Sequence, residues 1–211
     1  MKKFELTNEF VTNMFGTKLF RIRALVEFGD VEAGELGGYV EKESNLGHDD
    51  NAWVYGDARV YDNARVYDNA RVYGDAQVSG DARVYDNARV YGDAWVYGNA
   101  LVCGNARVYG DAWVYGNARV CGDARVCGDA LVCGDARVCG NGDYAYAHGF
   151  GSVNRTTTFF RLKDGGVGVR CGCFYGTLAQ FRDKIRETHG ETKKAQEYLM
   201  LADLMKLRFE K

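Results

Sequence analysis

Valine recurs at every sixth position of the central sequence, fifteen times without a break, from Val54 to Val138. Alanine keeps the same period from Ala52 to Ala136. An α-helix turns every 3.6 residues, so a period of six does not keep the valines on one helical face. Within a unit such as "ARVY" the side chains alternate as in a short strand whose alanine and valine point inward. The Gly-Asp, Gly-Asn or Asp-Asn pair that follows predicts a corner.

Strands this short are not stable alone, so successive units must coil and stack as a solenoid. Residues 52–141 resemble the hexapeptide-repeat proteins, whose units follow the pattern aliphatic-x-x-x-small-x. That resemblance implies a left-handed parallel β-helix of triangular section with three units per coil. Ordinary crossover rules favour the right hand, so the handedness rests on the resemblance. The predicted fold class is therefore mainly β, with about five coils of about 4.8 Å each.

The segments on either side of the repeats are expected to cap the solenoid. Residues 18–46 predict strands around a Gly-Asp turn, and "LGGYVEKESNL" with "NAWVYGDARV" resembles the opening of a group of bacterial, prophage and phage hexapeptide-repeat proteins. Downstream, "TTTFFRLKDGGVGVRCGC" predicts a hairpin, and Thr177 and Gln180 form a capping box before the first of two helices. The same group ends in a similar hairpin and helix pair. The predicted organisation is an N-terminal β cap (1–50), a β-helix (51–141), and a small α+β module made of a linker with a hairpin (142–176) and two helices (177–211).

Stacking residues 18 apart sorts the outward side chains into columns on three faces. The lower half of the second face lacks the arginines found elsewhere and carries a contiguous apolar patch. Because such patches mark interfaces, we predict that this one makes a homo-oligomer. The alternative is that the C-terminal segment covers this wall. The predicted interface residues are Trp95, Trp113, Leu131, Tyr97 and Tyr115.

The first face carries a column of arginines beside a column of tyrosines. Guanidinium groups suit phosphates and aromatic rings stack on bases, so this face is a candidate site for an anion or a nucleotide. The favoured alternative is that each arginine pairs with a corner aspartate and keeps the surface hydrated, because every copy is alike. The candidate anion-binding residues are Arg71, Arg89, Arg107, Tyr73, Tyr91 and Tyr109.

Many hexapeptide-repeat proteins are acyltransferases that use a histidine base on the coils. This chain has no histidine between residues 54 and 138 and no loop that interrupts the repeats; His48, His148 and His189 lie outside them. We therefore predict no catalytic residue, no cofactor and no metal. An acyltransferase site built from His148 or His189 with the C-terminal module is the remaining catalytic alternative.

The seven cysteines are predicted to be reduced thiols, because most stand where other repeats carry tyrosine. Cys103, Cys121 and Cys139 fall in one column, where α-carbons about 4.8 Å apart are within disulfide range. Cys171-Gly172-Cys173 is a lone CxC, which is weak evidence for a metal and favours packed small residues.

No stretch is long and apolar enough to span a membrane, and the start of the chain lacks the apolar run of a secretion signal. We therefore expect a cytoplasmic protein without a membrane partner. The formal net charge of −2 does not by itself indicate nucleic acid, and we do not expect nucleic acid as the partner. The predicted function is a non-catalytic, self-associating binding or scaffold protein, with a phage or prophage origin, and hence a host-cell cytoplasm, implied by the resemblance alone. The second hypothesis is capture of a nucleotide signal or of a host defence protein, and the third is an acyltransferase.

Overall fold

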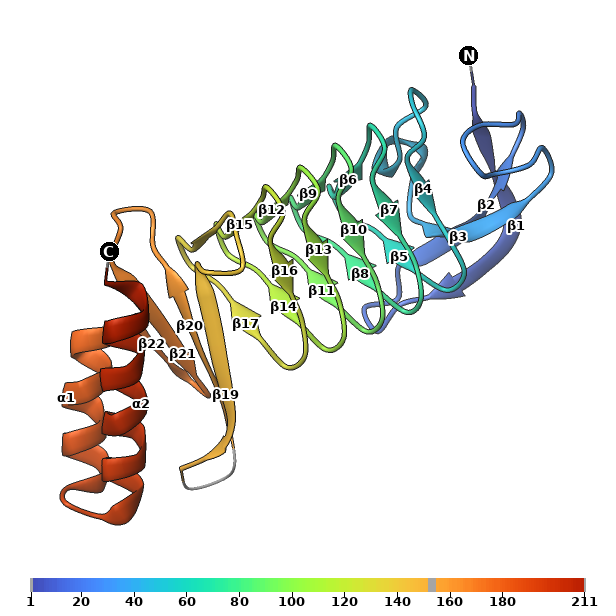
Figure 1. The fold of residues 1–211 in the computed structure, drawn as a ribbon. Coiled ribbons are helices and arrows are strands. Elements are labelled where there is room, and N and C mark those ends of the chain that lie inside the picture. The colour runs from blue at the N-terminus through green and yellow to red at the C-terminus, as the bar shows by residue number, and fades with distance from the viewer. Residues whose placement is uncertain (1, 152–154, 211) are drawn as a thin grey trace.

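A computed structural model describes residues 2–151 and 155–210 of the chain. A solenoid of short parallel strands occupies the middle of the molecule (Figure 1). A strand-rich N-terminal segment lies at one end, and a sheet backed by two helices lies at the other. The fold is therefore mainly β, as the repeats predict.

The N-terminal cap extends one sheet of the solenoid, and its Phe4 and Ile22 pack on the core at that end. Strands β1 (Phe4–Thr12), β2 (Lys18–Ala24) and β3 (Leu36–Val40) are antiparallel neighbours, and a short 3-10 helix (Glu43–Asn45) follows. β3 then pairs in parallel with β5, with Tyr39 opposite Arg59. The sequence predicts β2 and β3 but not β1.

Lys3 fastens the start of the chain to the first corner. Its ammonium donates hydrogen bonds to the carbonyl oxygens of Asp50 at 3.3 Å and Ala52 at 2.9 Å. Burial lowers the pKa of Lys3 to about 8, against the raising effect of the carboxylates of Asp50 and Asp49.

Each valine of the repeats lies on a two-residue strand, and these strands pair in parallel with one another in three sheets. One sheet has the order β1-β2-β3-β5-β8-β11-β14-β17, and the other two are β4-β7-β10-β13-β16 and β6-β9-β12-β15-β18. Paired residues are 18 apart, for example Arg89 and Arg107, so the expectation of three units per turn is confirmed. The bounds are β4 Trp53–Val54, β5 Arg59–Val60, β6 Arg65–Val66, β7 Arg71–Val72, β8 Gln77–Val78, β9 Arg83–Val84, β10 Arg89–Val90, β11 Trp95–Val96, β12 Leu101–Val102, β13 Arg107–Val108, β14 Trp113–Val114, β15 Arg119–Val120, β16 Arg125–Val126, β17 Leu131–Val132 and β18 Arg137–Val138.

The solenoid has about six turns, so the prediction of about five is too low. The additional turn comes from the N-terminal cap, where β3 pairs with β5 and Leu46 makes a parallel bridge to Val66. These residues do not follow the hexapeptide pattern, and for that reason counting valines misses them.

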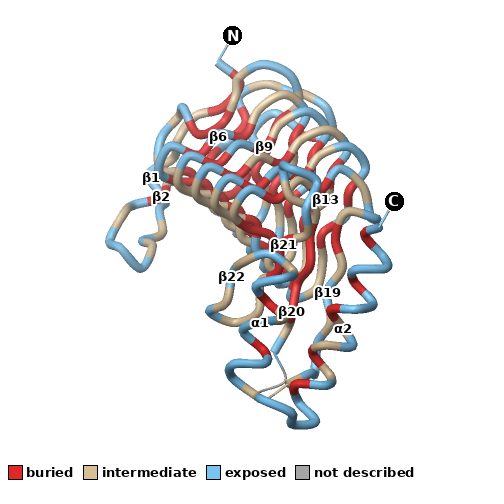
Figure 2. Tube along the Cα trace, turned by 90° about the vertical axis from the view of Figure 1, so that its left-hand side faces the viewer, coloured by how far each residue is buried: buried red, intermediate tan, exposed pale blue. Residues whose placement is uncertain are grey.

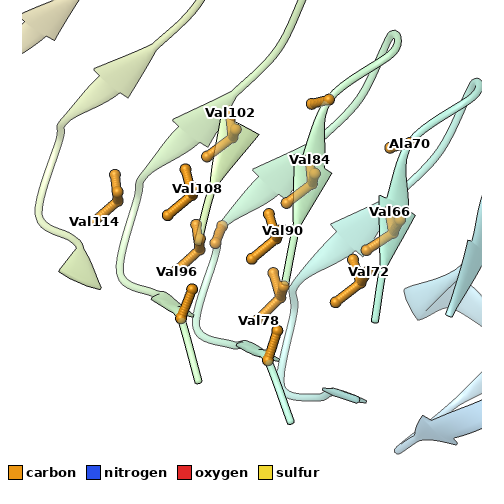
Figure 3. Packing of buried hydrophobic residues seen from close by; sticks show 14 of the residues in the cluster. Val66, Ala70, Val72, Val78, Val84, Val90, Val96, Val102, Val108 and Val114 are labelled. Atoms are coloured by element: carbon orange, nitrogen blue, oxygen red, sulfur yellow. The ribbon is translucent and has the colours of Figure 1, made fainter. Parts of the chain in front are cut away.

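The core is a stack of valines and alanines along the axis of the solenoid. Every valine from Val54 to Val138 is fully buried, and so is every alanine from Ala52 to Ala136. Valines 18 residues apart, such as Val72, Val90 and Val108, lie above one another inside the coils (Figure 3). Exposed residues follow the corners, and buried residues line the inside (Figure 2). The inward positions therefore fix the fold and leave the outward ones free to differ.

The corners need a left-handed backbone at their first position. Glycine supplies it at most corners, as at Gly74 with φ of 71°, and aspartate supplies it at Asp62, Asp68 and Asp86, each with φ of 57°. Aspartate adds a contact that glycine cannot make: the Asp86 carboxylate accepts a hydrogen bond from the backbone N–H of Gly104, one turn further on, at 2.9 Å. The corner aspartates thus link successive turns.

The C-terminal module is a four-stranded antiparallel sheet with two helices. Its strands are β19 (Tyr144–Phe150), β20 (Arg155–Arg161), β21 (Val167–Cys171) and β22 (Phe174–Thr177), in that order. The predicted hairpin is β20 and β21, and it is confirmed. Helix α1 (Leu178–His189) begins after the predicted capping box of Thr177 and Gln180, and α2 (Lys193–Phe209) follows after Thr192. Neither of the described helices is long and apolar enough to cross a membrane.

The module also closes the last turn of the solenoid, in agreement with the expectation that both flanking segments cap the repeats. One face of its sheet packs against the helices through Phe159, Val169 and Phe181. The other face places Phe160 and Tyr144 in the core of the solenoid. Residues 144–150, expected to be linker, form β19, which pairs antiparallel with β20 and buries only Tyr144 in that core.

Candidate functional site

The five predicted interface residues lie together on one sheet, and we call them the aromatic patch: Trp95, Tyr97, Trp113, Tyr115 and Leu131. Parallel pairing of β11, β14 and β17 sets Trp95 opposite Trp113 and Trp113 opposite Leu131. Tyr97 and Tyr115 each follow the valine of their strand and form the neighbouring column. The structure therefore brings the whole set together.

The rings of the aromatic patch are ordered by stacking. The Trp95 and Trp113 rings have centroids 5.2 Å apart and planes within 8°, and those of Tyr97 and Tyr115 are 4.9 Å apart and within 1°. Tyr97 also meets Trp113 edge to face at 6.1 Å and 77°. Trp113 is 38% exposed, a high value for a ring of this size. The patch is a rigid aromatic surface open to solvent at its centre.

The C-terminal module reaches the lower edge of the aromatic patch. The backbone N–H of Leu131 donates a hydrogen bond to Thr158 Oγ1 at 2.9 Å, and the neighbouring Cys133 is buried. Burial, together with a hydrogen bond to Cys133, raises the pKa of Tyr115, while the charge of Arg170 on β21 acts in the opposite direction. The alternative of a wall covered by the C-terminal segment therefore holds at this edge and not at Trp113.

The first face carries the predicted basic and aromatic columns, and we call them the arginine–tyrosine ladder: Arg71, Arg89, Arg107, Tyr73, Tyr91 and Tyr109. The arginines pair across β7, β10 and β13. The Tyr91 ring stacks on Tyr73 at 4.8 Å and on Tyr109 at 4.9 Å, with planes within 3°. The ladder is thus a flat, periodic array of cations beside ring edges.

The first arginine of the ladder is bound to the N-terminal cap. Arg71 Nη1 lies 2.8 Å from Asp30 Oδ2, and the Tyr55 hydroxyl donates to Asp30 Oδ1 at 3.0 Å. Although burial alone would raise the pKa of Asp30, the Tyr55 hydrogen bond and the Arg71 charge lower it. These residues, with Tyr73 and Arg89, line a shallow cavity of about 340 Å³.

The expectation that corner aspartates neutralise the arginines is wrong. Within residues 2–151 and 155–210, no arginine of the repeats forms an ion pair with a corner aspartate, and Arg71 pairs with Asp30 instead. Corner carboxylates bond along the axis instead: those of Asp62, Asp68 and Asp86 accept from backbone N–H groups of the next turn, and those of Asp81, Asp123 and Asp135 accept from asparagine side chains of the preceding turn. Arg89 and Arg107 keep their charges available at the surface.

The comparisons with known proteins agree with this architecture. The family model YdcK Beta solenoid repeat matches residues 64–80, 76–92, 82–98, 100–116, 112–128 and 118–134. These stretches contain both the aromatic patch and the arginine–tyrosine ladder. The chain is a β-solenoid repeat protein. The comparison with curated proteins gave no match.

The three histidines of this β-solenoid protein lie in separate places. The His48 ring stacks on Phe4 in the N-terminal cap and lies 2.9 Å from Glu43. His148 bonds Thr156 Oγ1 at 2.9 Å on β19, and His189 ends α1. No described hydrogen bond or ion pair joins any two of them.

The cysteines are free thiols in the structure, including the column Cys103, Cys121 and Cys139. Burial and a hydrogen bond with Cys139 raise the pKa of Cys121 to about 12, so this thiol is a poor nucleophile near neutral pH. Among the described residues, no group of three or more histidine, cysteine or acidic side chains is arranged to hold a metal ion.

Asp30 contacts the arginine–tyrosine ladder, and Arg170 lies near Tyr115 of the aromatic patch. The sequence analysis does not predict either residue as part of a site. Both lie outside the repeats, so the six-residue period carries no signal for them. They reach the coils only because β1–β3 and β19–β22 pack on the ends of the solenoid.

Proposed function

We propose that this protein is a non-catalytic scaffold that self-associates through the aromatic patch. The observation that carries this proposal is the exposed Trp113 ring at the centre of an ordered stack, in a slot that arginine occupies in most other repeats. Tryptophan and tyrosine are the residues that contribute most to protein interfaces. Stacking already fixes their rings, so little side-chain entropy is lost when a partner covers them.

A second copy of the chain is the partner that fits this patch best. The patch ends at Gln77 on its N-terminal side and at the C-terminal module on its other side. A patch of this limited length favours a closed contact between the same surfaces of two copies over an open chain of subunits. The surrounding columns are charged, which supplies the polar rim of such an interface.

Anion capture is the second candidate function, and Arg89 and Arg107 favour it. Neither pairs with a carboxylate among the residues that the structure describes, and both lie beside stacked tyrosines. A nucleotide could place its phosphate on the arginines and its base against the Tyr91 column.

The finer classification rests on the sequence resemblance. We propose that the coils are left-handed and triangular, as in hexapeptide-repeat proteins, and that the protein works in the cytoplasm with reduced thiols. The proposal that it does not catalyse acyl transfer rests on the lack of histidine on the coils. Release of free thiol above background from acetyl-CoA, with a panel of amine and hydroxyl acceptors, would contradict it.

Native mass spectrometry of the protein as purified from cells tests the scaffold proposal. We expect ions at a multiple of the 23.5 kDa chain mass. Ions at the single-chain mass alone, across a concentration series, would contradict self-association. A small added mass on each chain would favour anion capture, and fragmentation of those ions would identify the ligand.

A further inference from the structure

The C-terminal module contains a cavity that the aromatic patch and the ladder do not involve. It measures about 260 Å³ and lies between the second half of α1, the start of α2 and the ends of the strands. Its floor is apolar and aromatic, formed by Phe174, the buried Phe181 and Ile185, and Tyr198. The Phe181 ring meets Phe174 at 5.4 Å and Tyr198 at 5.8 Å.

The mouth of the cavity is positively charged. Arg155 and Lys184 supply the charge, His189 also lines the cavity, and no aspartate or glutamate is among its described lining residues. Lys184 Nζ lies 3.0 Å from Glu187 Oε2, but both side chains are exposed, so this pair holds the lysine only weakly. The Tyr198 hydroxyl already donates to the Phe150 carbonyl at 3.4 Å, which leaves its ring for packing.

The Cys171-Gly172-Cys173 motif positions the arginine at this mouth. Gly172 has φ of 56°, and a Cβ added there would overlap Nη1 of Arg155. The side chain of Arg155 therefore lies across the glycine, with Cys171 and Cys173 lining the cavity on either side. The motif needs glycine between its cysteines both for the backbone turn and for this arginine.

We propose that the cavity binds a small aromatic carboxylate. The carboxylate would lie on the Arg155 guanidinium, whose planar fork matches it, and near Lys184. The ring would enter between Phe181, Ile185 and Tyr198, where edge-to-face contacts are available. An apolar floor with few convergent polar groups is the usual composition of a small-molecule site.

Isothermal titration calorimetry with the full-length protein tests this site, with 2-naphthoate and naphthalene-2-carboxamide as probes. The two probes share the ring and differ in charge. We expect saturable 2-naphthoate binding at one site per chain, and at least about tenfold weaker binding of the carboxamide, because the charge-assisted hydrogen bonds are lost. Arg155→Gln should weaken 2-naphthoate binding by about tenfold or more.

Lys194→Gln is the matched control, because Lys194 is exposed on α2 and lies outside the cavity; it should leave the affinity within about twofold of the unaltered protein. Bound 2-naphthoate should also slow the alkylation of Cys173 by iodoacetamide, as followed by peptide mass spectrometry, without changing the alkylation of the distant Cys139. Equal affinity for the two probes, unchanged affinity in Arg155→Gln, or no saturable binding at millimolar concentrations would each overturn the proposal. None of these results bears on self-association, which uses another face.

Discussion

Trp95 stacks on Trp113 with their ring centroids 5.2 Å apart, although 18 residues of chain separate them. The distance is set by the strands beneath, because Val96 and Val114 pair inside the coil at the same level. The residue that precedes each valine is therefore stacked on the residue 18 positions away. Any residue type repeated every 18 positions forms a column on the surface. This is how a monotonous repeat can carry distinct faces.

Deleting residues 71–88 should remove one whole turn and leave the protein folded, because every valine, alanine and corner keeps its register. The solenoid should shorten by about 4.8 Å, measured by small-angle X-ray scattering, and should still associate. Loss of the β circular dichroism signal would contradict three units per turn.

Deleting only residues 71–76 should also leave the coil folded, but it moves the Trp95 and Trp113 strands off the sheet that continues into β3. If this second variant unfolds, continuity with the N-terminal cap matters more than the inward pattern.

Gly80→Ala should destabilise the solenoid by about 1–3 kcal/mol, because a left-handed backbone is strained for alanine. Gly80 has φ of 66°, and an added Cβ would lie 2.9 Å from the backbone nitrogen of Gly98. Gly142→Ala is the control, since its φ is not in that region and nothing lies within 4 Å of the added atom. Thermal unfolding followed by circular dichroism measures both variants, and equal midpoints would contradict the corner geometry.

Stability should fall steeply as the pH rises from about 10 to 12. A hydrogen bond with Cys103 and burial raise the pKa of Tyr85 to about 12, and burial raises that of Tyr198 to about 12. A tyrosine whose folded-state pKa exceeds its unfolded value of about 10 stabilises the fold below pH 10 and loses this contribution as pH rises through the folded value.

Urea unfolding at a series of pH values checks this alkaline loss. In Tyr198→Phe the free energy of unfolding should depend less steeply on pH between 10 and 12, because one titrating group is gone. The pKa of Lys3 is lowered to about 8, so this lysine makes the free energy of unfolding rise with pH between about 8 and its unfolded pKa of about 10.4. Above that pH, Lys3 no longer changes the pH dependence. An unchanged slope in the variant would show that Tyr198 does not titrate in this range.

If the arginine–tyrosine ladder captures anions, Arg89→Ala combined with Arg107→Ala should abolish the binding of a fluorescent nucleoside triphosphate at low salt. Binding to the unaltered protein should weaken steeply with added salt, because the contacts are ionic. Fluorescence anisotropy measures both effects. No binding to the unaltered protein at low salt would leave the ladder with a hydrating role only.

The sequence predicts the repeating part of the fold well because its signal is local. Val54 to Val138 fix the period, the three faces and therefore the members of both candidate surfaces. The alternation in residues 156–173 and the capping box at Thr177 are local signals too, and they predict the hairpin and α1.

The remaining features depend on contacts between distant segments. β1 pairs with β2 and extends a solenoid sheet, and Phe160 fits the core only once β20 lies across the last turn. The partner of Arg71 is Asp30, 41 residues upstream, and no spacing rule links them. The cavity of the C-terminal module likewise joins Arg155 from β20 with Lys184 from α1. Tertiary packing alone brings these groups together.

The mass of the protein in solution with and without the two stacked tryptophans tests the scaffold account most directly. Multi-angle light scattering should give a multiple of 23.5 kDa for the unaltered protein and 23.5 kDa for Trp95→Arg combined with Trp113→Arg. Leu101→Arg is the control, because it places the same residue in the same slot on another face and should keep the oligomer. The account is contradicted if the double variant retains the unaltered mass while its β circular dichroism signal is intact, or if the unaltered protein is a monomer at all concentrations.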